Sequence, residues 1–245
     1  MRLVTFNIAS LDGRIAASAS TPAWLDPTWK PLERFEPVDV MALHKTRVWL
    51  QGSNSFTARS AGAADFGDYA RREVPAGDFL PPILRSHQGR WMVAVDSRAR
   101  VRWTTAEMDG TRLAVLLAAA TPGPYRAYLR EHDVPYFEAG LRRVDLPAAL
   151  ARLAAVFATS SVISDAGGVL NGALLRAGLV DEADVQYLPA IVGQAEAPAL
   201  FEGFALGTSG VPAPVELISA EARPDGSIFA RYAVTRRAPR TVGDT

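Results

Sequence analysis

The sequence predicts an α/β fold of three layers, in which helices cover both faces of a mixed and mostly parallel sheet. Short apolar runs rich in β-branched residues alternate with helix-length segments along most of the 245-residue chain. Two strand-like runs near the carboxyl terminus instead flank the turn Arg-Pro-Asp-Gly at 223–226, which predicts an antiparallel hairpin. Apolar strands of the same kind resume after each loop-like segment. We therefore expect a single domain over 1–236 and a flexible tail over 237–245.

In the first half of the chain, apolar runs that end at glycine or turn residues predict the strands. RLVTFNIA at 2–9 is followed by the turn LDGR, and EPVDVMALHK at 36–45 reads as a short helix that leads into the strand RVWLQ at 47–51. Residues 57–90 are rich in Gly, Pro, Ala and charge and lack a sustained period, so we expect an excursion over the surface. WMVAVDS at 91–97 predicts the third strand.

The second half alternates strands and helices more clearly. Short apolar runs predict strands at 112–120, 134–139, 161–166 and 183–193, followed by the hairpin strands 214–222 and 227–234. Helical spacing of apolar residues predicts helices at 123–133, 146–158 and 167–179. Gly178 fits the position of a glycine that ends the last of these helices.

Composition narrows the class of partner. Positive and negative side chains are equal in number, 26 each, so no overall field would attract nucleic acid or an anionic membrane. The chain has no cysteine, and His44, His87 and His132 lack the spacing of metal ligands, so no metal site is predicted. No apolar run reaches the length of a membrane span. We expect a soluble, cytoplasmic protein whose partner is a small molecule.

Small and hydroxyl-bearing residues follow the predicted parallel strands, at the edge of the sheet where α/β proteins bind ligands. They are Ala9, Ser10, Asp12 and Gly13 after the first strand, Gly52, Ser53, Asn54 and Ser55 after the second, Asp96, Ser97 and Arg98 after the third, and Asp165 to Gly168 after the sixth. Their backbone and hydroxyl groups suit phosphate, ribose and amide groups, which favours a nucleotide-like ligand. Turn formation by Asp12 and Gly13, and capping by Asp96 and Ser97, are the alternatives.

The glycine pair Gly167-Gly168 lies between a predicted strand and a predicted helix. Glycines at such a junction let backbone approach a ligand closely, and the first N–H groups of the helix favour an anion. The spacing of Gly167, Gly168 and Gly172 is not the three-glycine dinucleotide fingerprint, and no lysine stands where a phosphate-loop nucleotide site needs one. A phosphate is the ligand we expect here.

Five short motifs carry a resemblance to a known family. They are SLDGRIA at 10–16, LQGS at 50–53, VDSR at 95–98, GGVLNGALLRAGLVDE at 167–182 and LPAIVG at 188–193. In this order, over nearly the whole chain, they resemble the C-terminal reductase domain of the bifunctional riboflavin-biosynthesis deaminase-reductase, which has a dihydrofolate-reductase-like fold. Met1 is followed directly by the first strand, and the cysteines of a zinc deaminase are missing. We therefore expect a free-standing reductase.

The resemblance implies NADPH as cofactor and a homodimer as assembly. In that family the glycine-pair loop and helix hold the NADPH phosphates, which assigns cofactor contact to Gly167, Gly168, Val169, Leu170 and Asn171. Further cofactor positions, by match or by their place in the loop after the second strand, are Ala9, Trp24, Gly52, Ser53, Ser55 and Ser97. The substrate contacts implied are Ser10, Asp12 and Arg59.

The chain departs from the family on the substrate side. Ala166 stands where the family usually has a Glu immediately before its glycine pair, and Pro22 stands where a serine is expected. Arg59 and Phe66 replace acidic and basic residues of the loop after the second strand. These departures concern the riboflavin-pathway substrate and leave the cofactor prediction intact.

We predict NADPH-dependent reduction of a C=N or C=O bond in a pteridine-like or ribosylaminopyrimidine phosphate-like substrate, as 5-amino-6-(5-phosphoribosylamino)uracil reductase performs. Asp165, beside the glycine pair, is the first catalytic candidate for handling a proton, and Asp12 is the second. Arg98 and Arg100 are candidates for the 2′-phosphate of the cofactor. Two alternatives stay open: a nucleotide-binding protein of the same fold without turnover, and a phosphosugar-binding domain that would not bind NADPH.

Overall fold

The computed structural model describes residues 1–18, 36–57, 63–72, 74–203 and 212–235. Its strands are β1 (Arg2–Ala9), β2 (Val48–Gly52), β3 (Arg90–Val95), β4 (Glu107–Met108), β5 (Thr111–Leu117), β6 (Tyr136–Glu138), β7 (Ser161–Ser164), β8 (Glu182–Tyr187), β9 (Val215–Ala222) and β10 (Ile228–Val234). Its α-helices are α1 (Pro37–Leu43), α2 (Ile83–Ser86), α3 (Gly123–Glu131), α4 (Leu146–Phe157) and α5 (Gly168–Arg176). Two short 3₁₀ helices are η2 (Ser53–Ser55) and η3 (Gly67–Tyr69).

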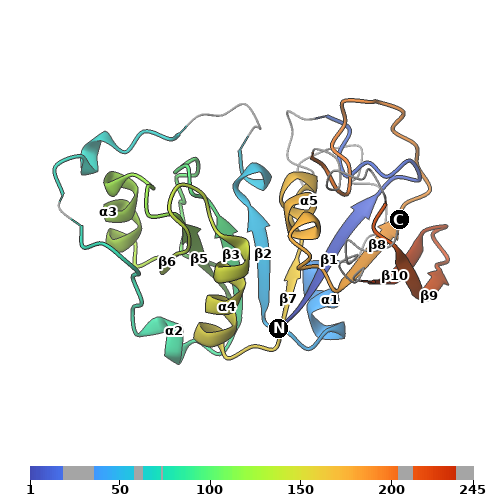
Figure 1. Ribbon diagram of the computed structural model, residues 1–245, viewed down its shortest axis with the longest axis horizontal. Helices are drawn as coiled ribbons and strands as arrows, with labels where there is room; N and C mark the ends of the chain where they lie inside the picture. Colours follow the sequence, from blue (N-terminus) through green and yellow to red (C-terminus); the bar gives the residue numbers. More distant parts are fainter. Residues whose placement is uncertain (19–35, 58–62, 73, 204–211, 236–245) are drawn as a thin grey trace, which may run out of the picture.

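The strands of these ranges form one mixed sheet in the order β4-β5-β3-β2-β7-β1-β8-β10-β9, with β6 beside β5 (Figure 1). β1 is parallel to β7 and β8, and β2 is parallel to β7 and β3. β10 runs antiparallel to both β8 and β9, so the carboxyl-terminal hairpin extends the sheet at one side. The α/β fold with a mostly parallel sheet and a terminal antiparallel hairpin is confirmed.

The elements differ from the sequence prediction mainly at their ends. The strand expected over 183–193 stops at Tyr187, because Pro189 follows and cannot donate a ladder hydrogen bond. The two-residue strand β4 was not predicted, since a pair this short has no periodicity to read. The excursion over 57–90 contains η3 and the single turn of α2. The expected tail 237–245 lies outside the described residues.

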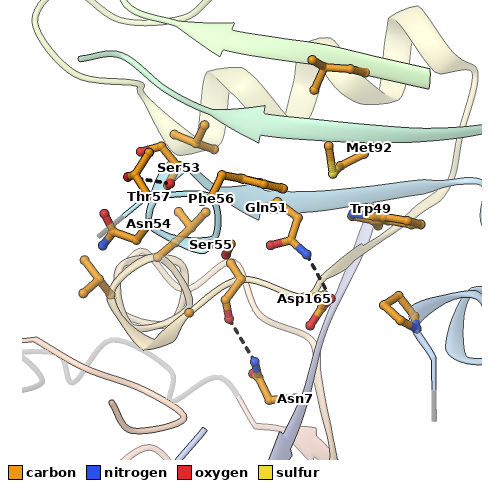
Figure 2. A pocket seen from close by; sticks show the side chains of 18 of the residues that line it. Asn7, Trp49, Gln51, Ser53, Asn54, Ser55, Phe56, Thr57, Met92 and Asp165 are labelled. Atoms are coloured by element: carbon orange, nitrogen blue, oxygen red, sulfur yellow. Dashed lines mark hydrogen bonds between the residues drawn. The ribbon is translucent and has the colours of Figure 1, made fainter. Parts of the chain in front are cut away.

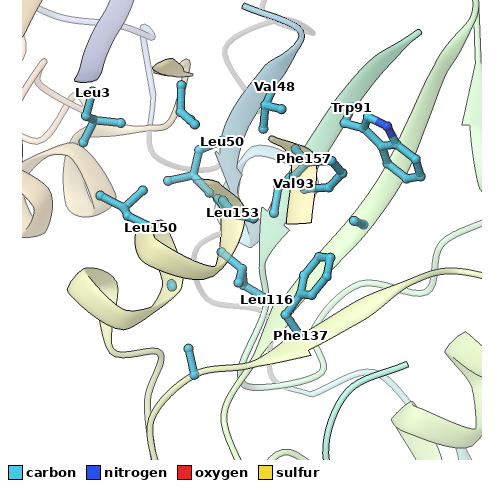
Figure 3. Packing of buried hydrophobic residues seen from close by; sticks show 14 of the residues in the cluster. Leu3, Val48, Leu50, Trp91, Val93, Leu116, Phe137, Leu150, Leu153 and Phe157 are labelled. Carbon is cyan, nitrogen blue, oxygen red and sulfur yellow. The ribbon is translucent and has the colours of Figure 1, made fainter. Parts of the chain in front are cut away.

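Helices α4 and α5 cover one face of the sheet. Leu150, Leu153 and Phe157 of α4 pack on Trp91, Val93 and Leu116 of the sheet and on Phe137, and all of these side chains are buried (Figure 3). The alternation of the strands sends Leu3, Val48 and Leu50 to this same side. Burial of this continuous apolar layer is the main favourable contribution to folding.

Helices α1 and α3 cover parts of the other face. Val40 and Met41 of α1 pack over Val4, Phe6 and Ile163, and the aromatic side chains of α3 pack over Val115 and Leu117. A strip of sheet between these two helices carries the partly buried side chains of Trp49 and Met92, next to the buried Leu113.

A buried ionic cluster lies at the start of β8. Glu182 accepts hydrogen bonds from Arg231 at 2.7 and 3.0 Å and is paired with Arg2, and His44 Nε2 lies 2.7 Å from Asp184 Oδ2. Burial raises the pKa of Asp184. Burial also acts to raise the pKa of Glu182, but hydrogen bonds and the two guanidinium charges hold it below its ordinary value. The cluster ties the end of α1 to β8 and β10.

No helix in the described part of the chain has both the length and the apolar character to cross a bilayer.

Candidate active site

A cavity of about 1120 Å³ extends along the carboxyl ends of the parallel strands and onto the strip of the sheet between α1 and α3. Its lining at the strand ends includes Gly52, Ser53, Asn54, Ser55, Ser97, Arg98, Gly167, Gly168, Val169 and Leu170. Its lining on the strip includes Trp49, Gln51, Phe56, Met92, Leu113 and Asp165 (Figure 2). Eight of the predicted cofactor residues that the structure describes, and the first catalytic candidate, therefore border one cavity.

Asp165 is held at the cavity wall by a residue from another strand. Gln51 Nε2 donates a hydrogen bond of 3.0 Å to Asp165 Oδ2, across 114 positions of sequence (Figure 2). Removal from water, helped by the charge of Glu36, raises the pKa of Asp165 from 3.8 to about 7, against the effect of the Gln51 hydrogen bond. The carboxyl group can therefore give or take a proton near neutral pH.

Sequence reasoning did not assign a role to Trp49 or Gln51. The alternation of β2 puts both on the face opposite Val48 and Leu50, so period-2 patterning was the available signal. Trp49 Nε1 and Gln51 Oε1 are buried and have no hydrogen-bond partner among the described residues. Both belong to residues that line the cavity.

The glycine pair begins helix α5 at the cavity. Gly167 is the N-cap residue in extended conformation, and the first N–H groups of a helix have no partner within the helix. A Cβ placed on Gly167 would meet only Ile15, at 4.0 Å, so the space beside this turn is open. Helix starts of this open kind favour an anion, so the phosphate remains a prediction for this turn.

Gly168 and Gly172 serve a second purpose that the sequence did not reveal. A Cβ on Gly168 would overlap the carbonyl oxygen of Ala199, and one on Gly172 would overlap that of Glu202. The Glu202 N–H donates a 2.8 Å hydrogen bond to the Gly168 carbonyl. The segment 199–202 therefore rests directly on these two glycines.

Asn171 lies in the interior and not at the cavity, which corrects its prediction as a cofactor contact. Its side chain accepts a hydrogen bond from Ser164 Oγ and donates to Asn7 Oδ1 and to the Ala166 carbonyl, at 2.7 to 2.9 Å. All these groups are buried. These hydrogen bonds join α5 to β7 and β1, because a buried amide needs partners for both its oxygen and its NH₂ group.

Ala9, Ser10 and Asp12 are also not among the residues that line the cavity. The exposed Asp12 carboxylate accepts hydrogen bonds from Ser10 Oγ and from the N–H groups of Val192 and Gly193, which lower its pKa to about 2. Asp12 joins the turn after β1 to the chain after β8. These contacts favour a turn-forming role for Asp12 over a catalytic one.

The remaining predicted residues either lie outside the described ranges or have roles in the fold. Trp24 and Arg59 lie outside the described residues, as does Pro22. Phe66 packs against Tyr125 and Tyr128 in the core and does not reach the cavity. Buried Asp96 caps the turn after β3 by accepting from the backbone N–H groups of Arg100 and Val101, as its alternative reading predicted.

One group in the described part of the chain has the composition of a metal site. Ligand atoms of His44, Glu182 and Asp184 lie within 4.8 Å of one another. Arg2 and Arg231 already neutralise these carboxylates, and guanidinium groups repel a cation. We assign the group to the ionic cluster of the fold.

Comparison with known proteins identifies the family of the chain. The sequence matches the family described as the RibD C-terminal domain over residues 2–229. The chain belongs to this family. A search of curated proteins finds no match by sequence.

Several solved structures share the fold of this RibD C-terminal domain. RibD of Acinetobacter baumannii has a TM-score of 0.63 at 20% identity, and the alignment covers 96% of this chain and 58% of that one. The chain thus spans somewhat over half the length of that RibD. A pyrimidine reductase-like protein from Corynebacterium diphtheriae gives 0.63 at 16% identity, covering 96% and 92% of the two chains. Riboflavin biosynthesis reductase Rib7 of Saccharomyces cerevisiae gives 0.56 at 15%, covering 96% and 90%.

The contact between α5 and the segment 199–202 makes a first prediction. Gly172→Ala should destabilise the protein by about 1 to 3 kcal/mol, because the added methyl group overlaps a backbone oxygen that cannot turn aside. Gly123→Ala, at a helix start with nothing within 4 Å of its Cβ position, should change stability by less than about 0.5 kcal/mol. Urea unfolding of both variants measures the difference. Equal midpoints would show that segment 199–202 moves away at little cost.

Proposed function

We propose that this RibD C-terminal domain is an NADPH-dependent reductase that acts on a C=N or C=O bond of a pteridine-like or ribosylaminopyrimidine phosphate-like substrate. The observation that carries the proposal is a carboxyl group with a pKa of about 7 in the same cavity as an open, glycine-started helix turn. The first feature can supply a proton and the second can hold a phosphate. Reductases of riboflavin biosynthesis with the same fold support this reading.

The residues along the strand ends fit NADPH. The turn at Gly167 to Leu170 would bind the pyrophosphate through backbone N–H groups. Gly52 continues the cavity wall on the neighbouring strand, and the side chains of Ser53, Ser55 and Ser97 add hydroxyl groups that suit ribose and phosphate oxygens. The cofactor supplies the hydride, while the protein positions the reactants and excludes water.

The strip between α1 and α3 fits a flat heterocyclic substrate. Trp49, Phe56, Met92 and Leu113 offer apolar surface against which a ring system can stack. Gln51, on the same strip, lines the cavity and donates to Asp165. Asp165 lies beside both, so a ring in this place has a proton donor near the bond to be reduced (Figure 2).

The proton balance of the reaction assigns a role to Asp165. Addition of hydride to the carbon of a C=N bond leaves a negative charge on nitrogen, which must take a proton. Protonated Asp165 would donate it, and Gln51 would then stabilise the carboxylate through its 3.0 Å hydrogen bond.

A nucleotide-binding protein without turnover is the second candidate. Its support is Ala166, which replaces the Glu expected before the glycine pair and is buried, with its carbonyl accepting from Asn7 and Asn171. NADPH binding without consumption across pteridines, flavins and the riboflavin precursor would favour this candidate.

Nucleotide titration tests the cofactor directly. The protein should bind NADPH saturably, followed by nicotinamide fluorescence. Gly167→Val should weaken this binding by roughly tenfold or more, because its side chain would enter the space proposed for a phosphate without disturbing the fold. Gly123→Val, outside the cavity, is the matched control. A wild-type protein that binds neither NADPH nor NADH would exclude the reductase.

Replacement of the carboxyl group tests the proton step. Asp165→Asn should lower turnover by about 10²- to 10⁴-fold and leave NADPH affinity nearly unchanged. Since the protonated form acts and its pKa is about 7, wild-type turnover should be constant below pH 7 and fall about tenfold per pH unit above it, whereas the variant should show no such fall. Asp68→Asn, which removes an exposed carboxylate on η3, is the control for loss of a negative charge. Equal loss of turnover and NADPH affinity would make Asp165 structural.

We further propose that the chain forms a homodimer through the outer hairpin strand. β9 ends the sheet, and its apolar side chains are exposed, 50% for Val215 and 60% for Leu217. Such an edge attracts another strand or apolar surface unless it is covered. A second copy of the chain would cover it with the same surface.

Light scattering measures this assembly. The double substitution Val215→Glu with Leu217→Glu should shift the protein from twice to once the mass of the chain, because it places charges in the contact. Met108 is also exposed, at 68%, but lies on β4 at the other edge of the sheet, so Met108→Glu should leave the mass unchanged. A monomeric wild-type protein at micromolar concentration would exclude the dimer.

A further inference from the structure

The cavity continues past the strip between α1 and α3 to the amino-terminal ends of β3 and β5. Its lining there includes Arg90, Met108 and Thr111. Arg90 begins β3, and Thr111 begins β5 directly beside it in the parallel ladder. Both side chains are half-buried, whereas Met108 is exposed. This far end of the cavity is separate from the strand ends that carry the glycine turn.

The strand register arranges this wall of the cavity in three levels. Gln51, which holds Asp165, is paired with Ala94 at the first level. The middle level carries the side chains of Trp49, Met92 and Leu113. Arg90 and its neighbour Thr111 form the last level, because alternation sends them to the same face as Met92 and Leu113. At about 3.3 Å per residue, Arg90 lies roughly 13 Å along β3 from the level of Gln51.

Arg90 is fixed by two neutral oxygen atoms. Its Nε donates a 3.1 Å hydrogen bond to Thr111 Oγ1, and its Nη2 donates a 2.8 Å hydrogen bond to the Asp109 carbonyl. In the part of the chain that the structure describes, no carboxylate forms an ion pair with this guanidinium group. Its charge is therefore held in place and not neutralised, which lowers the entropy cost of binding an anion.

Two carboxylates also border this end of the cavity. Glu107 accepts a 2.7 Å hydrogen bond from Arg112, so its charge is already balanced. Asp109 is exposed, and water screens its charge. The fixed positive charge of Arg90 is therefore the charge that a ligand meets from inside the cavity.

The middle level separates this charge from the reaction centre. The side chains of Met92 and Leu113 have no hydrogen-bond donor, so they favour an apolar linker over a polar one. A ring beside Asp165 can extend an arm across these two residues and reach Arg90 (Figure 2). The order along the wall is thus a proton donor, an apolar surface and a cation.

We propose that Arg90 forms a subsite for a carboxylate or phosphate group at the end of an arm on the substrate ring, with the arm lying over Met92 and Leu113. The inference rests on the proposed function, in which the ring lies beside Asp165, and adds to it the residue that recognises the far end of the substrate. Carboxylates and phosphates share the ability to accept charge-assisted hydrogen bonds from a guanidinium group. A heterocycle without such an arm would leave Arg90 in water.

Four compounds that share one flat, fluorescent isoalloxazine ring test the subsite. The first pair carries a carboxypentyl or a hydroxyhexyl arm on the same ring nitrogen, and the second pair is FMN and riboflavin. Each pair differs only in the anionic group at the end of the arm. Quenching of the ring fluorescence measures binding to the full chain without turnover. At least one anionic compound should bind roughly tenfold or more tightly than its neutral partner.

Variants at Arg90 assign this preference to its charge. Arg90→Gln removes the charge but keeps a donor for Thr111, and it should reduce the preference to less than about twofold. Arg90→Lys keeps the charge and should retain part of the preference. Arg85→Gln, at an exposed position of α2 outside this cavity, should leave it unchanged. Thermal unfolding confirms that each variant is folded.

The outcomes separate this inference from the proposed function. A preference in the first pair identifies a carboxylate as the bound group, and one in the second pair identifies a phosphate. No preference in either pair, an equal preference in folded Arg90→Gln, or no binding of any of the four compounds would overturn the subsite. A protein that binds NADPH under these results keeps the reductase function. A protein that binds neither NADPH nor NADH but shows the preference that depends on Arg90 keeps the subsite and loses the reductase.

Discussion

The architecture of the cavity depends on the close approach of the segment 197–202 to two other parts of the chain. The Ile15 N–H donates to the Pro198 carbonyl and the Leu200 N–H to the Gly13 carbonyl, so the segment is joined to the turn after β1. On its other side it rests on Gly168 and Gly172 of α5. Because Ile15, Pro198 and Gly168 all line the cavity, this packing arrangement forms one part of the cavity wall.

Much of the fold was readable from local patterns, and the reasons are specific. The apolar run at 2–9 belongs to a strand buried on both faces, and the helical spacing of 146–158 marks a face buried on the core, so these patterns located both elements. The burial of Glu182 and Asp184 was not readable, because alternation with Ala183 and Val185 looks like a half-exposed strand. Only the partners brought by the fold, Arg231 and His44, make their burial possible.

The site was predictable at the level of the sheet edge and less so residue by residue. Ser97 and Asp165 lie at the cavity because each stands within two residues of the end of a parallel strand. Asn171 lies away from the cavity because its turn of α5 faces β7 and β1. Asp12 lies away from it because the N–H groups of residues 192–193 donate to its carboxylate. The pairing of Gln51 with Asp165 joins two strands that are distant in sequence, so neither segment alone could show it.

The ionic cluster at the start of β8 lies at the opposite end of the sheet from Gly52, Ser97 and Gly167. Residues whose loss would leave a buried charge unpaired are thus kept apart from residues that border the cavity. This separation lets the two ends change independently during evolution. A substitution of Ala166, before the glycine pair, therefore leaves the paired charges of the ionic cluster in place.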